Sequence, residues 1–253
     1  MPEPQKMKKP DVKVVILGDM NVGKTSLLHR YTERKFKDTI STVGGAFFLK
    51  QWGPYNISIW DTAGRTQPGR EQFHGLGSMY CRGAAAVILI YDVTNWQSYV
   101  ELENRFLSLT DTANDDCIFA IVGNKADLTD LQAHITDTEP GQEAESEADA
   151  APVNLPPCPS SHLLHKQVNR QDAMALYGRV LHYKGLEEKA CLPAEKMCFE
   201  TSAKTGFNVD VLFETVFDML LPSILKKRSD GESSTVDLEA PRTHKKNKAG
   251  CCS

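Results

Sequence analysis

The first residues able to do chemistry follow the first apolar run of the chain. They read Gly18-Asp19-Met20-Asn21-Val22-Gly23-Lys24-Thr25, which fits the pattern G-x-x-x-x-G-K-[ST], and sequence of helical period follows them. In such a loop, backbone N–H groups face phosphate oxygens, the lysine reaches the terminal phosphates and the threonine hydroxyl reaches Mg²⁺. A nucleoside triphosphate site is therefore predicted at Asn21, Val22, Gly23, Lys24, Thr25 and Ser26.

A second polar group, Asn124-Lys125-Ala126-Asp127, comes just after an apolar run that ends at Val122. The sequence N-K-x-D at the carboxyl end of a strand resembles the guanine-recognition element of Ras-like GTPases. There the aspartate accepts both N–H donors of the guanine edge, and adenine lacks that donor pair. Ser202-Ala203-Lys204, within ETSAK, resembles the second base-contacting loop of that family. The expected ligand is GTP or GDP.

Two further loops resemble the switch regions of the family. Asp61-Thr62-Ala63-Gly64 resembles its D-T-A-G element, in which the carboxylate holds Mg²⁺ through water and the glycine N–H approaches the γ-phosphate. Thr42 resembles the switch threonine whose hydroxyl joins Mg²⁺ when the third phosphate is present. Phe36 matches the aromatic residue that packs edge-on against guanine. The resemblance thus implies Thr25, Thr42 and Asp61 as metal ligands.

Several strings are similar to those that distinguish the Rab branch from Ras and Rho. They include Leu89-Ile90-Tyr91-Asp92-Val93-Thr94 and Met79-Tyr80-Cys81-Arg82-Gly83-Ala84. The segment EQFHGLGSMYCRGA is most similar to endosomal and phagosomal Rabs. The resemblance implies a switch that hydrolyses GTP and recruits effectors to regulate vesicle traffic. It also implies exchange factors, activating proteins and effectors as partners. The implied effector surface comprises Val43, Gly44, Phe47, Trp60 and Tyr80.

The chain ends in Cys251-Cys252-Ser253, which resembles the Rab signal for two geranylgeranyl groups. Two lipid chains hold a protein on a membrane where one does so only reversibly, and Lys245, Lys246 and Lys248 would add attraction for acidic lipids. The expected location is the cytosol and the cytoplasmic face of Golgi, endosomal or phagosomal membranes. A prenylation escort protein and a dissociation inhibitor are further implied partners.

The residues expected to carry catalysis are Lys24, Thr42, Gly64 and Arg65, and the chain departs from the Rab pattern at the last of these. Arg65 replaces a glutamine that orients the attacking water, and an arginine cannot accept a hydrogen bond from that water. Met20 and Asn21 are larger than the usual residues and crowd the space beside the γ-phosphate. These departures predict slow intrinsic hydrolysis and an altered response to activating proteins.

The switch regions also depart from the pattern in length. Joining Arg65 directly to Glu71 would restore the family spacing, so residues 66–70 are either a genuine lengthening of the second switch or an artefact of exon choice. Thr42 lies eighteen residues after Lys24, one fewer than usual. Ala46 replaces the common acidic residue before Phe47. Effector choice therefore does not transfer from typical Rabs.

The composition of the whole chain bounds its class. With 253 residues and 41% hydrophobic content it can bury one substantial core, and its net charge of −4 gives no basic surface for nucleic acid, which is not an expected partner. No apolar run is long enough to span a bilayer, and the first residues lack the apolar stretch of a secretory signal. The seven cysteines form no CxxC pair.

The elements that must position these residues alternate between apolar runs and segments of helical period. Strands are expected at 12–17, 55–60, 84–91, 117–122 and 197–200, and helices from about 24, at 97–109, 170–183 and 209–225. This alternation predicts an α/β fold, a doubly wound, mostly parallel six-stranded sheet with helices on both faces, as in P-loop small GTPases. The expected domain spans 11–225 and contains a disordered acidic insertion at about 129–166. Flexible ends are expected at 1–10 and 226–253.

Three other interpretations compete with an active GTPase. An ATP-dependent phosphotransferase is disfavoured by Asp127 and the SAK loop. A binding module that loads GTP with very slow or negligible hydrolysis is a serious alternative because of Met20 and Arg65. A scaffold with a dead site is disfavoured by intact Lys24 and Thr25. The acidic insertion is interpreted as a solvated segment.

Overall fold

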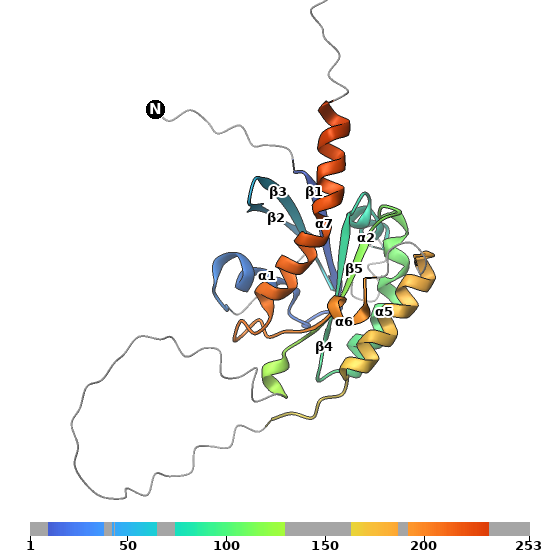
Figure 1. Ribbon diagram of the computed structural model, residues 1–253. Coiled ribbons are helices and arrows are strands. Elements are labelled where there is room, and N and C mark those ends of the chain that lie inside the picture. Colours follow the sequence, from blue (N-terminus) through green and yellow to red (C-terminus); the bar gives the residue numbers. More distant parts are fainter. Residues whose placement is uncertain are drawn as a thin grey trace, which may run out of the picture.

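The computed structural model describes residues 10–37, 42, 44–64, 74–129, 163–186 and 192–232. Within these residues six strands form one sheet in the order β2-β3-β1-β4-β5-β6 (Figure 1). The strands are β1 (Val12–Gly18), β2 (Gly45–Trp52), β3 (Tyr55–Thr62), β4 (Ala86–Asp92), β5 (Ile118–Asn124) and β6 (Cys198–Glu200). Only β2 pairs antiparallel, with β3, so the predicted mostly parallel sheet is confirmed.

The middle strands are apolar because both of their faces are covered. Every residue of β4 is buried, as a central parallel strand requires. In β2, by contrast, exposed residues alternate with half-buried ones, because this edge strand has one solvated face. The sequence prediction did not locate this strand, in which only every second residue is even partly buried.

Helices cover both faces of the sheet. The helices are α1 (Lys24–Glu33), α2 (His74–Cys81), α3 (Trp96–Glu101), α5 (Arg170–Lys184), α6 (Ala194–Met197) and α7 (Val209–Glu232). Figure 1 shows α1 and α7 on one face, with α2 and α5 on the other. Tyr31 of α1 stacks on Phe213 of α7, with ring centroids 4.3 Å apart, and this contact joins the two helices of the first face.

The segment expected to form one helix at 97–109 changes its hydrogen-bonding pattern twice. After α3 it continues as a π-helical turn, Leu102–Phe106, and then as a 3-10 turn, Ser108–Thr112. Leu107 N–H donates to the carbonyl of Leu102, five residues back, at 3.0 Å. The predicted helix is therefore present, and the apolar period alone could not distinguish its α-helical, π-helical and 3-10 parts.

The last helix, expected to end at Leu225, continues to Glu232. Arg228 explains the continuation, because its guanidinium donates to both carboxylate oxygens of Asp11 at 2.8 and 2.9 Å and to the carbonyl of Pro54 at 3.0 Å. It also lies 4.6 Å from the ring centroid of Tyr55. The polar end of the helix is thus attached to the hairpin between β2 and β3. This contact could not be predicted from the local sequence.

The acidic insertion was expected at 129–166, and its predicted end at residue 166 is too late in the sequence. Residues 163–169 are described, and the N–H of Leu164 donates to the carbonyl of Leu128 at 2.7 Å. Lys166 binds Glu200 at 2.6 Å. The rest of the predicted insertion, 130–162, lies outside the described residues, as do most of the predicted flexible N-terminus and residues 233–253 of the tail.

Candidate nucleotide and magnesium site

A cavity of about 390 Å³ opens where β1 and β5 end at the carboxyl edge of the sheet. It brings together most of the predicted nucleotide-binding residues. The residues that line it are Met20, Asn21, Gly23, Lys24, Thr25, Ser26, Phe36, Lys37, Thr42, Gly64, Asn124, Lys125, Asp127, Leu128, Ala203 and Lys204. Val22, Asp61 and Ser202 do not line it, but each contacts a residue that does.

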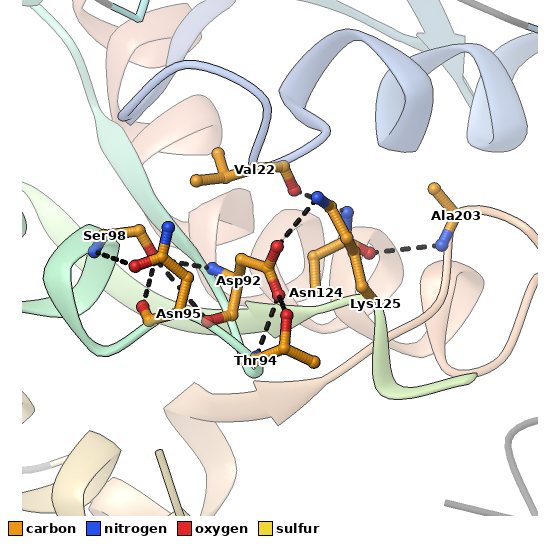
Figure 2. A network of polar contacts seen from close by, with 8 residues as sticks. All are labelled: Val22, Asp92, Thr94, Asn95, Ser98, Asn124, Lys125 and Ala203. Carbon is orange, nitrogen blue, oxygen red and sulfur yellow. Dashed lines mark hydrogen bonds and ion pairs between the residues drawn. The ribbon is translucent and has the colours of Figure 1, made fainter. Parts of the chain in front are cut away.

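The loop between β1 and α1 is fixed by close backbone packing. A Cβ atom on Gly18 would lie 2.2 Å from the carbonyl oxygen of Ile90, so only glycine fits there. Gly23 has φ of 91°, and a Cβ on it would lie 2.5 Å from Nδ2 of Asn124. The same Nδ2 donates to the carbonyl of Val22 at 2.8 Å (Figure 2). The phosphate loop and the base loop are therefore joined directly.

Lys24 supplies a buried cation beneath this loop. Its Nζ donates to the carbonyls of Gly18 at 2.9 Å and Asp19 at 2.7 Å. Burial lowers the pKa of Lys24 to about 8, while the carboxylates of Asp61 and Asp19 act in the opposite direction. An anionic phosphate in the cavity would stabilise the charged ammonium, since a nearby opposite charge raises the pKa of a lysine.

Two hydroxyls and one carboxylate meet beside Lys24. Oγ1 of Thr25 donates to Oδ2 of Asp61 at 2.5 Å and lies 2.8 Å from Oγ1 of Thr42, which lies 3.3 Å from the same Oδ2. The other oxygen, Oδ1 of Asp61, is buried with no hydrogen-bond partner among the described residues. Burial raises the pKa of this carboxyl group.

These oxygens fit a magnesium ion. Mg²⁺ prefers hard oxygen ligands, takes few of them from the protein and keeps several waters. A cation would compensate the buried charge of Asp61 and give Oδ1 a partner. The described residues hold no group of three or more histidine, cysteine, aspartate or glutamate side chains placed for a metal. One carboxylate with two hydroxyls therefore suits this ion better than a metal that needs nitrogen or sulfur ligands.

The base side of the cavity is built from β5 and the loop after β6. Asp127 is 3% exposed, and its Oδ1 accepts from Oγ of Ser202 at 2.6 Å. Oδ1 of Asn124 accepts from the N–H of Ala203 at 3.2 Å. Arg30 of α1 donates to the carbonyls of Ala203, at 2.8 Å, and Lys204. The two predicted base loops thus form one hydrogen-bonded unit.

The rim of the cavity carries Phe36, predicted to pack against guanine, and Met20, predicted to crowd the phosphate end. Their exposed fractions are 46% and 43%, and both line the cavity. A Cβ on Gly64 would lie 2.4 Å from the backbone nitrogen of Met20, so the switch glycine touches the phosphate loop. Met20 and Gly64 thus lie side by side at the cavity, and the crowding expected from the Met20 side chain stays a prediction.

Three of the five predicted effector residues, Phe47, Trp60 and Tyr80, form a separate aromatic cluster. The ring centroids of Phe47 and Trp60 are 5.3 Å apart, and those of Trp60 and Tyr80 are 5.8 Å apart. A Cβ on Gly45 would lie 2.9 Å from the Tyr80 ring, so the first residue of β2 packs on that ring. None of the three aromatic residues lines the nucleotide cavity.

Some predicted residues lie outside the described part of the chain: Val43, Arg65, residues 66–70, Cys251 and Cys252. Other residues of the site were not predicted. Lys37 and Leu128 line the cavity and follow Phe36 and Asp127 directly, so their neighbours could have identified them. Arg30 was missed because its partners, Ala203 and Lys204, are far away in the sequence. In the described part of the chain, no helix combines the length and apolarity that crossing a bilayer demands.

Comparison with known proteins identifies a matching family profile and several similar proteins. The profile of the Ras family matches residues 13–221. The human Ras-related protein Rab-20 is 60% identical over 249 residues, which is 97% of this chain and 100% of that protein. The mouse Ras-related protein Rab-20 is 59% identical over 246 residues, with the same shares. Mouse Ras-related protein Rab-21 is 41% identical over 143 residues, 54% of this chain and 60% of that protein.

Proposed function

Because this chain belongs to the Ras family as a Rab-type GTPase, which binds GTP and GDP and hydrolyses GTP, we propose that the cavity at the carboxyl edge of its sheet is the guanine-nucleotide site. One observation carries this assignment. Asp127 is buried at the cavity, fixed by Ser202, and linked through Asn124 to the phosphate loop. A preformed carboxylate acceptor at this place favours guanine, whose edge offers two N–H donors.

The phosphates belong at the other end of the cavity in this proposal. Lys24 and the N–H groups at the start of α1 bind the terminal phosphates, as in other phosphate loops. Thr25, Thr42 and Asp61 would hold Mg²⁺, which supplies positive charge to the phosphate oxygens when bound. Because Thr42 belongs to the first switch region, its hydroxyl links the state of that region to the presence of the third phosphate.

Hydrolysis is proposed to be slow. Met20 lines the cavity and its backbone nitrogen lies beside Gly64, and Arg65 stands in the sequence where a water-orienting glutamine is usual. Without an acceptor for the attacking water, the barrier to hydrolysis rises. The same observations favour a second candidate, a GTP-loaded binding module whose state is set by exchange rather than by turnover.

The proposed setting is the cytoplasmic face of endosomal or phagosomal membranes, where the protein recruits effectors that regulate vesicle traffic. Its relatives over the full length are named as Rab proteins, and Cys251 and Cys252, which precede Ser253, are suited to geranylgeranyl groups. Phe47, Trp60 and Tyr80 form the proposed effector surface. Exchange factors, activating proteins, an escort protein and a dissociation inhibitor are the other proposed partners.

The decisive experiment identifies the nucleotide that copurifies with the full chain and follows single-turnover GTP hydrolysis, for the whole protein and for a variant without residues 66–70. We expect bound GDP or GTP, preference for guanosine over adenosine nucleotides, and slow hydrolysis. Arg65→Gln is the matched variant, and we expect it to raise the rate by about tenfold or more. No base preference in the presence of Mg²⁺ would refute the site. Hydrolysis that Arg65→Gln does not accelerate would refute the proposed cause of slowness.

A further inference from the structure

The last residue of β4, Asp92, carries a carboxylate that the nucleotide site as described above does not use. Its Oδ1 accepts from the N–H of Thr94 at 2.9 Å and from Oγ1 of Thr94 at 2.7 Å. Its Oδ2 forms an ion pair with Nζ of Lys125 at 2.7 Å. Figure 2 shows Asp92 between Thr94 and Lys125, on the side of the network where β4 ends.

The carboxylate is held in one orientation from one side. The two bonds from Thr94 form a short Asx turn that fixes the oxygen they share. The backbone of Asp92 is fixed as well, because its N–H donates to Oγ of Ser98 at 3.0 Å and Ser98 belongs to the first turn of α3. Asn95 caps that helix by accepting from the N–H of Ser98. Oδ2 therefore offers an acceptor at a fixed place.

Lys125 is held on the other side in an uncommon conformation. It has φ of 66°, a left-handed backbone that an L residue adopts at a cost of about 1 kcal/mol or more. It stands between Asn124 and Asp127 in the base loop, and it lines the nucleotide cavity. Opposite Asp92 in the strand register lies Asn124, which explains why the carboxylate reaches the ammonium of the next residue.

We propose that Asp92 is a positioning residue for nucleotide binding. By holding the ammonium of Lys125, it keeps the lysine stem in the cavity wall, so the base meets a surface that is already in place. Such preorganisation lowers the entropy lost on binding and slows dissociation. The inference rests on the proposed function, because Lys125 must contact the nucleotide for Asp92 to act through it.

The test measures the rate of GDP release from the full chain with Mg²⁺, for Asp92→Asn, Lys125→Met and the double variant. Asp92→Asn keeps the shape and an acceptor for Thr94, and removes the charge that Lys125 binds. We expect GDP release to become about tenfold faster, as for the loss of one hydrogen bond between charged groups. In the Lys125→Met background, the same substitution is expected to change the rate less than about twofold.

Asp11→Asn is the matched control. Asp11 also pairs one oxygen with a backbone N–H, that of Asn56 at 2.7 Å, and both oxygens with a cation, Arg228, and its side chain is 13% exposed against 10% for Asp92. It lies at the opposite end of β1 from the phosphate loop. We expect it to leave GDP release unchanged, whatever it does to the melting temperature.

The possible outcomes distinguish the nucleotide role of Lys125 from the positioning role of Asp92. If Lys125→Met leaves GDP release unchanged, the nucleotide role of Lys125 fails and the positioning role fails with it. If Lys125→Met accelerates release but Asp92→Asn does not, or if the two effects multiply, only the positioning role is overturned. Should Asp92→Asn fold poorly, Thr94→Val replaces it. That variant removes one of the two bonds that fix Oδ1, and we expect a smaller acceleration, about threefold, that again vanishes without Lys125.

Discussion

At the scale of single residues, the site holds charges that its own surroundings do not fully compensate. Lys24 is bound by backbone carbonyls and its pKa is lowered by burial, and Oδ1 of Asp61 has no partner among the described residues. Burying charges in this way costs free energy unless a ligand supplies the opposite charge. A bound phosphate would supply negative charge beside Lys24, and a bound cation would supply the positive charge for Asp61.

Asp61→Asn should reduce the stabilisation by Mg²⁺ without lowering the stability of the metal-free protein. In the GDP-loaded wild-type protein, Mg²⁺ at a hundredfold excess over its Kd should add about 2.7 kcal/mol to the free energy of unfolding. The variant should lose most of that gain. With a chelator present, the variant should melt at the same temperature as the wild type or higher, because it no longer buries an uncompensated carboxylate. Thermal melting with and without Mg²⁺ checks both signs, and an undiminished response to Mg²⁺ would contradict the assignment.

Replacing each of two core tyrosines by phenylalanine should have different effects on the free energy of unfolding. The Tyr91 hydroxyl is buried with no hydrogen-bond partner among the described residues, and it lies where a Cβ on Gly123 would clash. Tyr91→Phe should therefore leave the free energy of unfolding unchanged or raise it by up to about 1 kcal/mol. The Tyr99 hydroxyl donates to the carbonyl of Asp172 at 2.9 Å and accepts from Arg179 at 3.1 Å. Tyr99→Phe should cost about 1–2 kcal/mol in the same urea titration.

At the scale of elements, α5 has a complete start signal. Oδ1 of Asn169 accepts from the N–H of Asp172 at 3.0 Å, and Oδ2 of Asp172 accepts from the N–H of Asn169 at 2.9 Å, which is a capping box. Asn169→Ala should lower the free energy of unfolding by about 1 kcal/mol, while Asn169→Asp, which keeps a cap, should cost much less. Equal losses for the two variants in chemical denaturation would show that the cap contributes nothing.

This helix was also among the elements that the sequence predicted well, and the reason is local. Its start at Arg170 follows from the apolar period, and β4 follows from an unbroken apolar run. The π-helical turn after α3 and the last turns of α7 could not be predicted in the same way. Arg228 binds Asp11, 217 residues away in the sequence, so the end of α7 depends on a contact that no local window contains.

The candidate site shows the same division. Lys24, Thr25 and Asp127 were predicted because each sits in a short motif whose spacing has a chemical reason. The bond from Oγ of Ser202 to Asp127 required the fold, since it joins residues 75 apart in the sequence. The ion pair of Asp92 with Lys125 likewise depends on β4 and β5 lying side by side in register. Motifs thus predict which groups would contact a ligand, and the tertiary structure shows which side chains bond to those groups.

At the scale of the whole molecule, the residues that flank the predicted acidic insertion lie next to each other. The N–H of Leu164 donates to the carbonyl of Leu128 at 2.7 Å, and Lys166 anchors the returning chain on Glu200. Leu128 lines the nucleotide cavity, so the point of insertion borders the base loop. A domain whose insertion begins and ends at one hydrogen bond does not need that insertion to close its fold.

Deletion of Asp130 to Ser161 tests this independence. It leaves only Thr129, His162 and Leu163 between Leu128 and Leu164, and at that spacing the same carbonyl and N–H can bond in a single α-turn. The shorter connection costs less closure entropy, so the free energy of unfolding should stay equal or rise by about 1–2 kcal/mol.

The affinity for GDP and GTP should stay within about threefold of the full chain, because the residues that line the cavity are all kept. Titration with a fluorescent guanine nucleotide measures this affinity. A large loss of affinity in the deletion variant would show that the inserted segment takes part in nucleotide binding.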